Sequence, residues 1–174
     1  MLAAPRTASL EGMPDDTNIH FFYRTAHPFS NFHPSVFVAD GHTFHTAEQY
    51  IMHRKATFFG DEGTARRILQ ARHPGECKRF GRRVKPYDDH AWASVREQVA
   101  FDACLLKFTQ HARLRAFLLG TGDALLVEAS PTDAIWGIGF GEHDALAHRH
   151  AWGLNLLGAA LMRVRAALRA EESR

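Results

Sequence analysis

An apolar stripe near the C-terminus sets the strongest limit on how this chain folds. Its members recur at intervals of three or four residues, and they are Leu154, Leu157, Leu161, Val164 and Leu168. This spacing predicts a long helix with one face that must be buried against other elements. With 174 residues, 45% of them hydrophobic, the chain is long enough to form one such core.

Two short strands and a hairpin are predicted around this helix. Residues 18–23 and 125–129 are rich in aromatic or aliphatic side chains and predict strands. Residues 35–39 and 42–44 flank the pair Asp40-Gly41. That pair favours a type I′ hairpin turn, because both of its central positions need a positive φ.

Capping residues mark the starts of the other helices. Thr46, followed three residues later by Gln49, forms a capping box for a helix that ends near Phe59. Residues 111–119 continue helically up to a glycine, whereas residues 130–144 contain proline and glycines and predict a loop. Three further residues are placed to begin helices, namely Asp61, Pro74 and Asp88.

These elements predict an α+β fold, a predominantly helical single domain with a small antiparallel β-sheet. We expect residues 18–170 to form this domain and residues 1–17, which are small, polar and contain proline, to form a flexible N-terminal tail. No apolar run approaches a membrane span, and the start lacks the basic and apolar segments of a secretory signal. We therefore expect a cytoplasmic protein without a membrane partner. The sequence indicates no oligomeric state.

Composition argues against several classes of function. The 21 basic and 19 acidic side chains leave a net charge of only +2, which argues against a general nucleic-acid coat but allows a local phosphate pocket. Cys77 and Cys104 have no metal-type spacing, and none of the 12 histidines lies in a His-Glu-x-x-His motif. Gly-x-Ser-x-Gly and Walker motifs are missing too. The sequence therefore predicts neither a metal site nor a cofactor.

Glu48 and Lys55 lie seven residues apart on the helix that begins after Thr46. Seven residues are almost two turns, so both side chains point the same way, roughly 10 Å apart along the axis. They are too distant for an i,i+4 ion pair, but they are placed to flank a ligand. The pattern alone favours the simpler interpretation, in which Lys55 extends along an apolar edge and Glu48 is solvated.

The segment after the second strand combines two carboxyl groups, Glu128 and Asp133, with Trp136 and nearby glycines. Loops held by a strand are common positions for catalytic groups, and glycines let backbone amides approach a phosphate. An ordinary turn explains the same residues, with Asp133 as its cap and Trp136 in the core. Helical phase likewise favours a core position for Trp92, although a stacked, partly exposed ring stays open.

Several spaced motifs resemble the NADAR/YbiA-like family of N-glycosidases from about residue 20 to residue 168. Their order along the chain is more specific than any single motif. The matching segments are Pro-Phe-Ser-Asn-Phe (28–32), Thr-Ala-Glu-Gln-Tyr (46–50) with Lys-Ala (55–56), Lys-Phe-Thr-Gln-His (107–111), Thr-Gly-Asp-Ala (121–124), Leu-Val-Glu-Ala-Ser-Pro-Thr-Asp (126–133) with Trp-Gly (136–137), and Gly-Leu-Asn-Leu-Leu-Gly (153–158) with Leu-Met-Arg-Val-Arg (161–165).

The resemblance implies hydrolysis of N-glycosidic bonds in ribosyl phosphates. Two substrate classes are associated with the family. The first is the ribosylamino-pyrimidine 5′-phosphates of the riboflavin pathway, and the second is ADP-ribosylated guanine in nucleic acid. The sequence does not choose between them.

The reaction needs a stabilised leaving nitrogen, a stabilised cationic sugar carbon and a delivered water. We expect Glu48 and Asp133 to be the catalytic carboxyl groups, either of them as acid or water-orienting base. Lys55 either binds phosphate or attacks the sugar carbon to form a Schiff base. The residues expected to bind substrate are Arg24 for phosphate, Asn31 for ribose or base, Trp92 and Trp136 for stacking, and Asn155, which is nearly as well explained as a polar residue at a helix start.

Two other classes of function compete with this assignment. A non-catalytic module that binds ADP-ribose or another nucleotide would need the phosphate and stacking groups but not the carboxyl groups. A nucleic-acid-binding domain would use the basic cluster between residues 66 and 85, which is better explained as a solvated helical face. The members of this cluster are Arg66, Arg67, Arg72, Lys78, Arg79, Arg82, Arg83 and Lys85.

Overall fold

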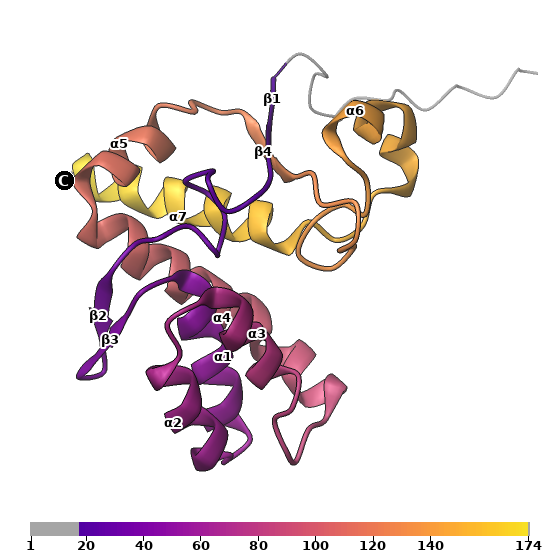
Figure 1. The fold of residues 1–174 in the computed structure, drawn as a ribbon. Helices are drawn as coiled ribbons and strands as arrows, with labels where there is room; N and C mark the ends of the chain where they lie inside the picture. The colour runs from indigo at the N-terminus through magenta and orange to yellow at the C-terminus, as the bar shows by residue number, and fades with distance from the viewer. Residues whose placement is uncertain (1–17, 174) are drawn as a thin grey trace, which may run out of the picture.

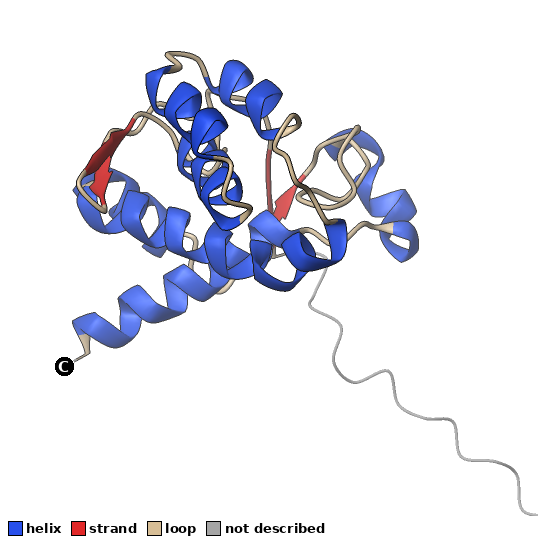
Figure 2. Ribbon diagram, turned by 90° about the horizontal axis from the view of Figure 1, so that it is seen from below, coloured by secondary structure: helices blue, strands red, loops and turns tan. Residues whose placement is uncertain are grey.

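Helices dominate the computed structural model, which describes residues 18–173 (Figures 1 and 2). The segment predicted as an N-terminal tail lies outside the described residues. In Figure 1 the helices α1 (Ala47–Phe58), α2 (Glu62–Gln70) and α3 (Pro74–Gly81) gather in the lower half, and helix α7 (Leu156–Glu172) crosses the upper half. The expected α+β fold with mostly helical content is confirmed.

Helix α7 buries the predicted apolar stripe against α4 (Asp89–Gln110) and β4 (Leu125–Glu128). Leu157, Leu161, Val164 and Leu168 are each at most 1% exposed. The expectation for Leu154 was wrong, because this residue precedes the helix and is 60% exposed. Asn155 separates it from the helix with a left-handed backbone conformation, at φ +49°.

The strands form two separate pairs within the described residues. β2 (Phe37–Ala39) and β3 (His42–Phe44) make the expected antiparallel hairpin, with Asp40 at φ +50° and Gly41 at φ +75° in the turn. β1 (Ile19–Phe22) instead pairs with β4 in parallel, which corrects the prediction of a single antiparallel sheet. Helices α1 to α4 and α5 (Ala112–Leu119) lie between these strands in the chain, and such a long crossover allows parallel pairing.

The capping predictions hold at the starts of α1, α2 and α4. Thr46 accepts a hydrogen bond from the backbone N–H of Gln49 at 3.2 Å. The hydrogen bonds of the Gln49 amide differ from those of a simple capping box. Its oxygen accepts from the backbone N–H of His45. Its nitrogen donates to carbonyl groups at the end of α2, including those of Ile68 and Ala71. Gln49 therefore joins α1 to α2 as well as capping it. Asp61 and Asp88 cap α2 and α4 through the N–H groups of Thr64 and Ala91.

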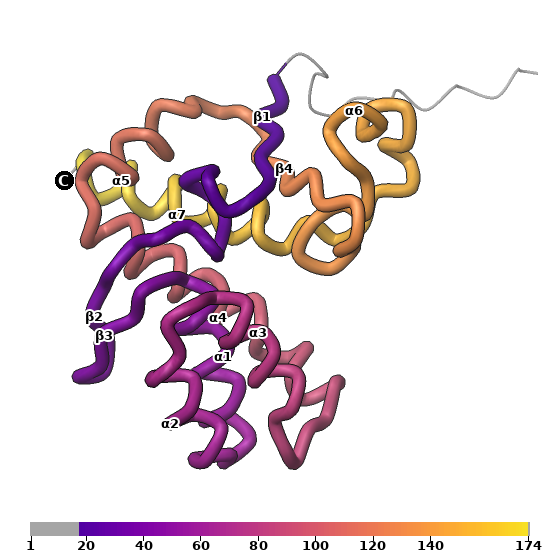
Figure 3. The backbone as a smooth tube through the Cα atoms, in the orientation of Figure 1, coloured from indigo at the N-terminus to yellow at the C-terminus, as the bar shows by residue number. Residues whose placement is uncertain are grey.

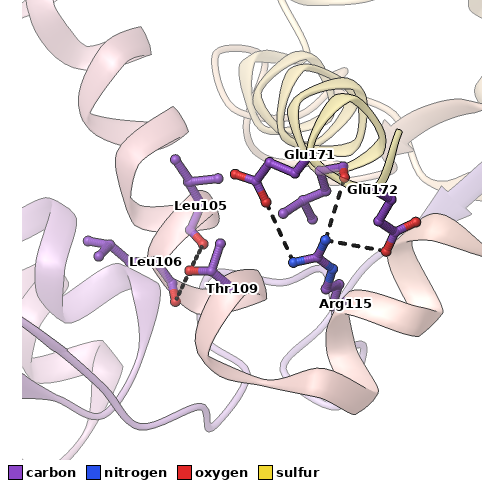
Figure 4. A network of polar contacts seen from close by, with 7 residues as sticks. Leu105, Leu106, Thr109, Arg115, Glu171 and Glu172 are labelled. Atoms are coloured by element: carbon purple, nitrogen blue, oxygen red, sulfur yellow. Dashed lines mark hydrogen bonds and ion pairs between the residues drawn. The ribbon is translucent and has the colours of Figure 1, made fainter. Parts of the chain in front are cut away.

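Helix α5 (Ala112–Leu119) closes the end of the molecule where α7 terminates. Arg115 on α5 forms ion pairs with Glu171 and Glu172 at 3.6 and 3.3 Å (Figure 4). At the other end, the predicted loop 130–144 ends early, since α6 (Glu142–Ala145) begins within it and leads into a 3₁₀ segment, Leu146–Ala151. Among the described residues, none of the helices has the length and apolar character needed to cross a membrane.

Candidate active site

Two adjoining cavities lie where the ends of β1 and β4 meet α1, α3 and α4. The larger has a volume of about 660 Å³ and the smaller of about 180 Å³. They adjoin because four residues line both, namely Lys78, Arg82, Ile135 and Trp136. The larger cavity also contains Arg24, Phe32, Glu128 and Asp133, and the smaller contains Glu48, Lys55, Tyr87, Trp92 and Arg96.

Glu48 lies in the first turn of α1 and is only 7% exposed. Its backbone N–H donates to the carbonyl oxygen of Asn31 at 2.9 Å, which ties the helix start to the preceding loop. Burial raises the pKa of its carboxyl group to about 7, an effect opposed by Lys78 and reinforced by Asp133. The interpretation of Glu48 as a solvated surface residue is therefore wrong. This carboxyl group can hold or release a proton near neutral pH.

Lys55 lines the smaller cavity together with Glu48, as their spacing predicted. Its ammonium group lies over the Tyr87 ring, 4.1 Å from the ring centroid, and 5.9 Å from that of Trp92. Burial lowers the pKa of the amine, and the charges of Asp89 and Glu48 oppose this shift. Lys55 makes no salt bridge to a carboxylate of the described residues. The charged end of Lys55 therefore lies against aromatic rings of the cavity and not against a carboxylate of the described residues.

Asp133 both caps a turn and lines the larger cavity. Its Oδ1 atom accepts hydrogen bonds from the backbone N–H groups of Ile135 and Trp136 at 2.9 and 2.8 Å. The loop folds back on the end of β4, where a Cβ at Gly137 would lie 2.7 Å from the carbonyl oxygen of Glu128. The structural and the functional interpretation of Asp133 are thus compatible, since one carboxylate oxygen suffices for the cap.

Glu128 is a site residue that the sequence-based assignment missed. It is the last residue of β4, and its side chain lines the larger cavity. Burial raises the pKa of its carboxyl group to about 7, and the charge of Asp133 contributes to the same shift. Its Oε2 atom is buried without a hydrogen-bond partner among the described residues. The available signal was its position at the end of a strand, directly before the glycine-bearing loop.

The cationic groups of the site come largely from α3 and its end. Lys78 and Arg82 are four residues apart, so they lie on one face of the helix, and both line the two cavities. They belong to the basic cluster that was interpreted as a solvated helical face. Arg24 adds a third cation from the end of β1, where its φ of +68° is a conformation that few non-glycine residues adopt. These three side chains make the larger cavity suited to phosphate.

The remaining predicted residues differ in their relation to the cavities. Trp136 lines both, whereas Trp92 packs in the core with α1 and the hairpin and lines the smaller cavity. Asn31 is buried and lines neither of the two; its Oδ1 atom has no partner among the described residues. Asn155 lies behind the site, where its amide bonds to the backbone of Leu126 and Glu128. Within residues 18–173 no group of three or more His, Cys, Asp or Glu is placed to hold a metal ion.

Several known N-glycosidases are similar to this chain in sequence. N-glycosidase YbiA of Escherichia coli (strain K12) is 39% identical over 171 residues, which cover 96% of this chain and 98% of that protein. An N-glycosidase of Nostoc punctiforme is 36% identical over 152 residues, covering 86% of this chain and 92% of that protein. An N-glycosidase of Acanthamoeba polyphaga mimivirus is 38% identical over 122 residues, 69% of this chain and 72% of that protein.

The structural and family comparisons agree with these sequence matches. The NMR structure of Escherichia coli YbiA superposes with a TM-score of 0.76 at 38% identity, covering 95% of this chain and 92% of that one. The family model described as the NADAR domain matches residues 21–169, which include every residue of the two cavities. This chain therefore belongs to the NADAR domain family, within its YbiA-like N-glycosidase group.

Proposed function

We propose that this N-glycosidase hydrolyses the bond between a nitrogen base and a ribose that carries a 5′-phosphate group. The observation that carries the proposal is one combination of groups. The buried carboxyl group of Glu48 and the partly buried one of Glu128, each with a pKa of about 7, lie in two cavities that share a cationic wall. The carboxyl groups suit proton transfer near neutral pH, and the cations suit phosphate.

The binding roles follow from the walls of the cavities. Arg24, Lys78 and Arg82 hold the 5′-phosphate in the larger cavity, whose volume of about 660 Å³ leaves room for the ribose as well. Trp136 separates the phosphate region from the smaller cavity and offers a flat apolar surface for the base or sugar. Trp92 supplies a second aromatic edge beside Lys55. Asn31 lies behind Glu48, where its carbonyl oxygen fixes the start of α1.

Lys55 acts as the nucleophile in this mechanism. The larger cavity already contains three cations for phosphate, and partial burial lowers the pKa of the Lys55 amine. In the first step Lys55, after losing its ammonium proton to solvent, bonds through its neutral nitrogen to C1 of the ribose while the bond from C1 to the base breaks. The leaving base nitrogen takes the proton of Glu48. The sugar ring then opens, its ring oxygen accepts a proton from the lysine nitrogen, and a Schiff base remains.

Water completes the reaction at the same carbon. It adds to C1 and passes one proton to Glu128, which leaves a carbinolamine. The hydroxyl proton of the carbinolamine then moves to the lysine nitrogen as the bond from C1 to that nitrogen breaks, so that the sugar aldehyde and neutral Lys55 are released. The proton on Glu128 returns through solvent to Glu48. Asp133 faces this carbon from the loop, where its negative charge stabilises the positively charged sugar and its free oxygen orients the water. The net reaction consumes one water and releases the free base and the sugar phosphate.

The burial of the carboxyl groups favours an enzyme over a pure binding module. Two carboxyl groups held uncharged up to about pH 7 destabilise the folded state once they ionise, and a module that only binds ADP-ribose gains nothing from them. A role in proton transfer explains why the carboxyl groups of Glu48 and Glu128 both lie in this site. Binding of ADP-ribose without release of a base from either substrate class would favour the module instead.

The test offers the pure protein both substrate classes, a ribosylamino-pyrimidine 5′-phosphate and an ADP-ribosylated guanine oligonucleotide, and measures the released base by mass. We expect release from at least one of them and a strong decrease with Glu48→Gln, Lys55→Ala and Asp133→Asn. Full activity in all three variants would rule out the mechanism. Loss of activity that accompanies unfolding is identified by circular dichroism on each variant.

A further inference from the structure

Strand β4 has one edge without a partner strand. Its other edge pairs with β1 in parallel, so that the N–H groups of Leu125 and Ala129 donate to the carbonyl oxygens of Asn18 and Phe22. Leu126 and Glu128 alternate with them and face away from β1. Among the described residues this sheet has only two strands, so the N–H of Glu128 and the carbonyl oxygen of Leu126 need another partner. The carbonyl oxygen of Glu128 already accepts from the backbone N–H of Ile138 at 3.0 Å.

The side chain of Asn155 takes the place of a third strand at this edge. Its Oδ1 atom accepts the backbone N–H of Glu128 at 3.0 Å, and its Nδ2 atom donates to the carbonyl oxygen of Leu126 at 2.9 Å. One planar amide thus makes both hydrogen bonds that the backbone of a neighbouring strand would make to the N–H of Glu128 and the carbonyl oxygen of Leu126. The contact is close, because a Cβ at Gly158 would overlap the Leu126 carbonyl oxygen and the Asn155 amide.

The same segment also holds the loop that contains Asp133. The N–H groups at the start of α7 lack partners within the helix, and they donate to loop carbonyl groups instead. Leu154, Leu156 and Leu157 bond in this way to Ala134, Ile135 and Trp136, at 2.8, 3.1 and 3.1 Å. Figure 3 shows this loop turning back from β4 towards the start of α7. The segment from Leu154 to Leu157 therefore contacts both the edge of β4 at Glu128 and the loop that contains Asp133.

We propose that Asn155 is a positioning residue, which holds the carboxyl group of Glu128 beside Asp133 through the edge of β4. This inference rests on the proposed function in giving Glu128 the proton from the attacking water. Its physical basis is local, since the hydrogen bond from Asn155 ends on the backbone of Glu128 itself. The left-handed φ of +49° at Asn155 explains the residue type, because asparagine tolerates this conformation better than most side chains.

The test compares Asn155→Gly with the wild type. Glycine accepts the left-handed backbone conformation but removes both side-chain hydrogen bonds. A second variant, Asn155→Ser, is made in parallel, because the serine side chain is too short to bridge the two backbone groups. Thr121→Ala is the matched control. The Thr121 hydroxyl accepts a hydrogen bond from Arg165 on α7, the helix that Asn155 precedes, and Thr121 lines neither of the two cavities described above. The carboxyl group of Glu128 is titrated by ¹³C NMR, and kcat is measured against pH.

We expect Asn155→Gly and Asn155→Ser to lower kcat on the order of tenfold, because small displacements of reacting groups are costly. The midpoint of the Glu128 titration should decrease as water reaches the loosened carboxyl group, while Thr121→Ala leaves it unchanged. In a Glu128→Gln background, Asn155→Gly should produce no further loss of kcat, because both changes act through one group.

Two outcomes would overturn the inference and a third concerns only the proposed function. If the Glu128 titration in Asn155→Gly matches the wild type, Asn155 does not position this carboxyl group. If the losses of kcat multiply in the double variant, Asn155 acts by another route. Absence of base release from the wild type would refute the proposed function, and the NMR titration would still decide the role of Asn155.

Discussion

The backbone N–H of Glu48 donates a 2.9 Å hydrogen bond to the carbonyl oxygen of Asn31. It thereby joins the first turn of α1 to the loop that follows β1. Lys107 also holds this loop: the residue is 1% exposed, and its ammonium group donates to the carbonyl oxygens of Pro28 and Ser30 at 2.6 and 2.9 Å. A lysine on α4 thus supports the position of Glu48 without contacting the cavities.

Replacement of Lys107 by methionine should therefore weaken both stability and catalysis. It leaves two carbonyl groups of the loop without their charged donor, which costs about 2 kcal/mol in the free energy of unfolding. Urea unfolding measures this loss, and the base-release assay should show a lower kcat. Lys85→Met, which removes an exposed lysine outside the cavities, is the control. An unchanged unfolding free energy in Lys107→Met would contradict the supporting role of Lys107.

Glu48→Gln should stabilise the protein above neutral pH while abolishing base release. In the folded state the pKa of Glu48 is raised to about 7 from an ordinary value of 4.5, so between these values the folded state binds more protons than the unfolded state. Stability therefore falls as pH rises through this window and stays lower above it, by up to about 3 kcal/mol. Glutamine cannot ionise, so this part of the pH dependence should disappear.

The measurement for this prediction is the free energy of unfolding from pH 4.5 to 8 for the wild type and the variant. Glu62→Gln on the exposed surface of α2 is the matched control for the change from glutamate to glutamine. A wild-type curve that rises with pH across this window, with no difference for Glu48→Gln, would show that Glu48 ionises normally in the folded state.

Lys55→Ala should abolish trapping of the sugar on the protein by borohydride. Reduction of a Schiff base leaves a stable adduct on the lysine that formed it, and mass spectrometry of the digested protein locates that lysine. Lys78→Ala is the matched control, because Lys78 lines both cavities but has the role of a phosphate ligand. We expect Lys78→Ala to raise KM and still give the adduct. An adduct that persists in Lys55→Ala would assign the nucleophile to another residue.

Two substitutions of Asp133 should separate its two roles. Asparagine keeps an oxygen that can accept the N–H groups of Ile135 and Trp136, so Asp133→Asn should fold normally and lose activity. Alanine removes the cap as well, and Asp133→Ala should in addition lose about 1 kcal/mol in the free energy of unfolding. Thermal unfolding beside the base-release assay distinguishes the two. Wild-type activity in Asp133→Asn would restrict Asp133 to the structural role.

Local signals predicted most elements of the fold. The turn at Asp40 and Gly41, the caps at Asp61 and Asp88 and the helical stripe after Asn155 all depend on residues within a few positions of each other. The errors lie where distant segments decide the outcome. Pairing of β1 with β4 joins strands about a hundred residues apart, and its direction depends on how the intervening helices pack.

The candidate site shows the same division. Glu48 and Lys55 were found together because one helix carries both, and Asp133 and Trp136 because one loop does. Glu128 and the pair Lys78 and Arg82 were assigned to the site only from the structure. A carboxyl group acquires a raised pKa by losing water, and the groups that exclude water from Glu128 come from other parts of the chain.

Sequence periodicity, capping residues and turn residues thus sufficed to predict the helices, the hairpin and the candidate pair Glu48 and Lys55 on α1, because these features arise from contacts over a few residues. The meeting of α1, α3 and the β4 loop around two cavities required the tertiary structure. Burial and long-range charge are properties of the packed molecule. They decided that the carboxyl groups of Glu48 and Glu128 titrate near pH 7 and that Asn155 supports the site from behind.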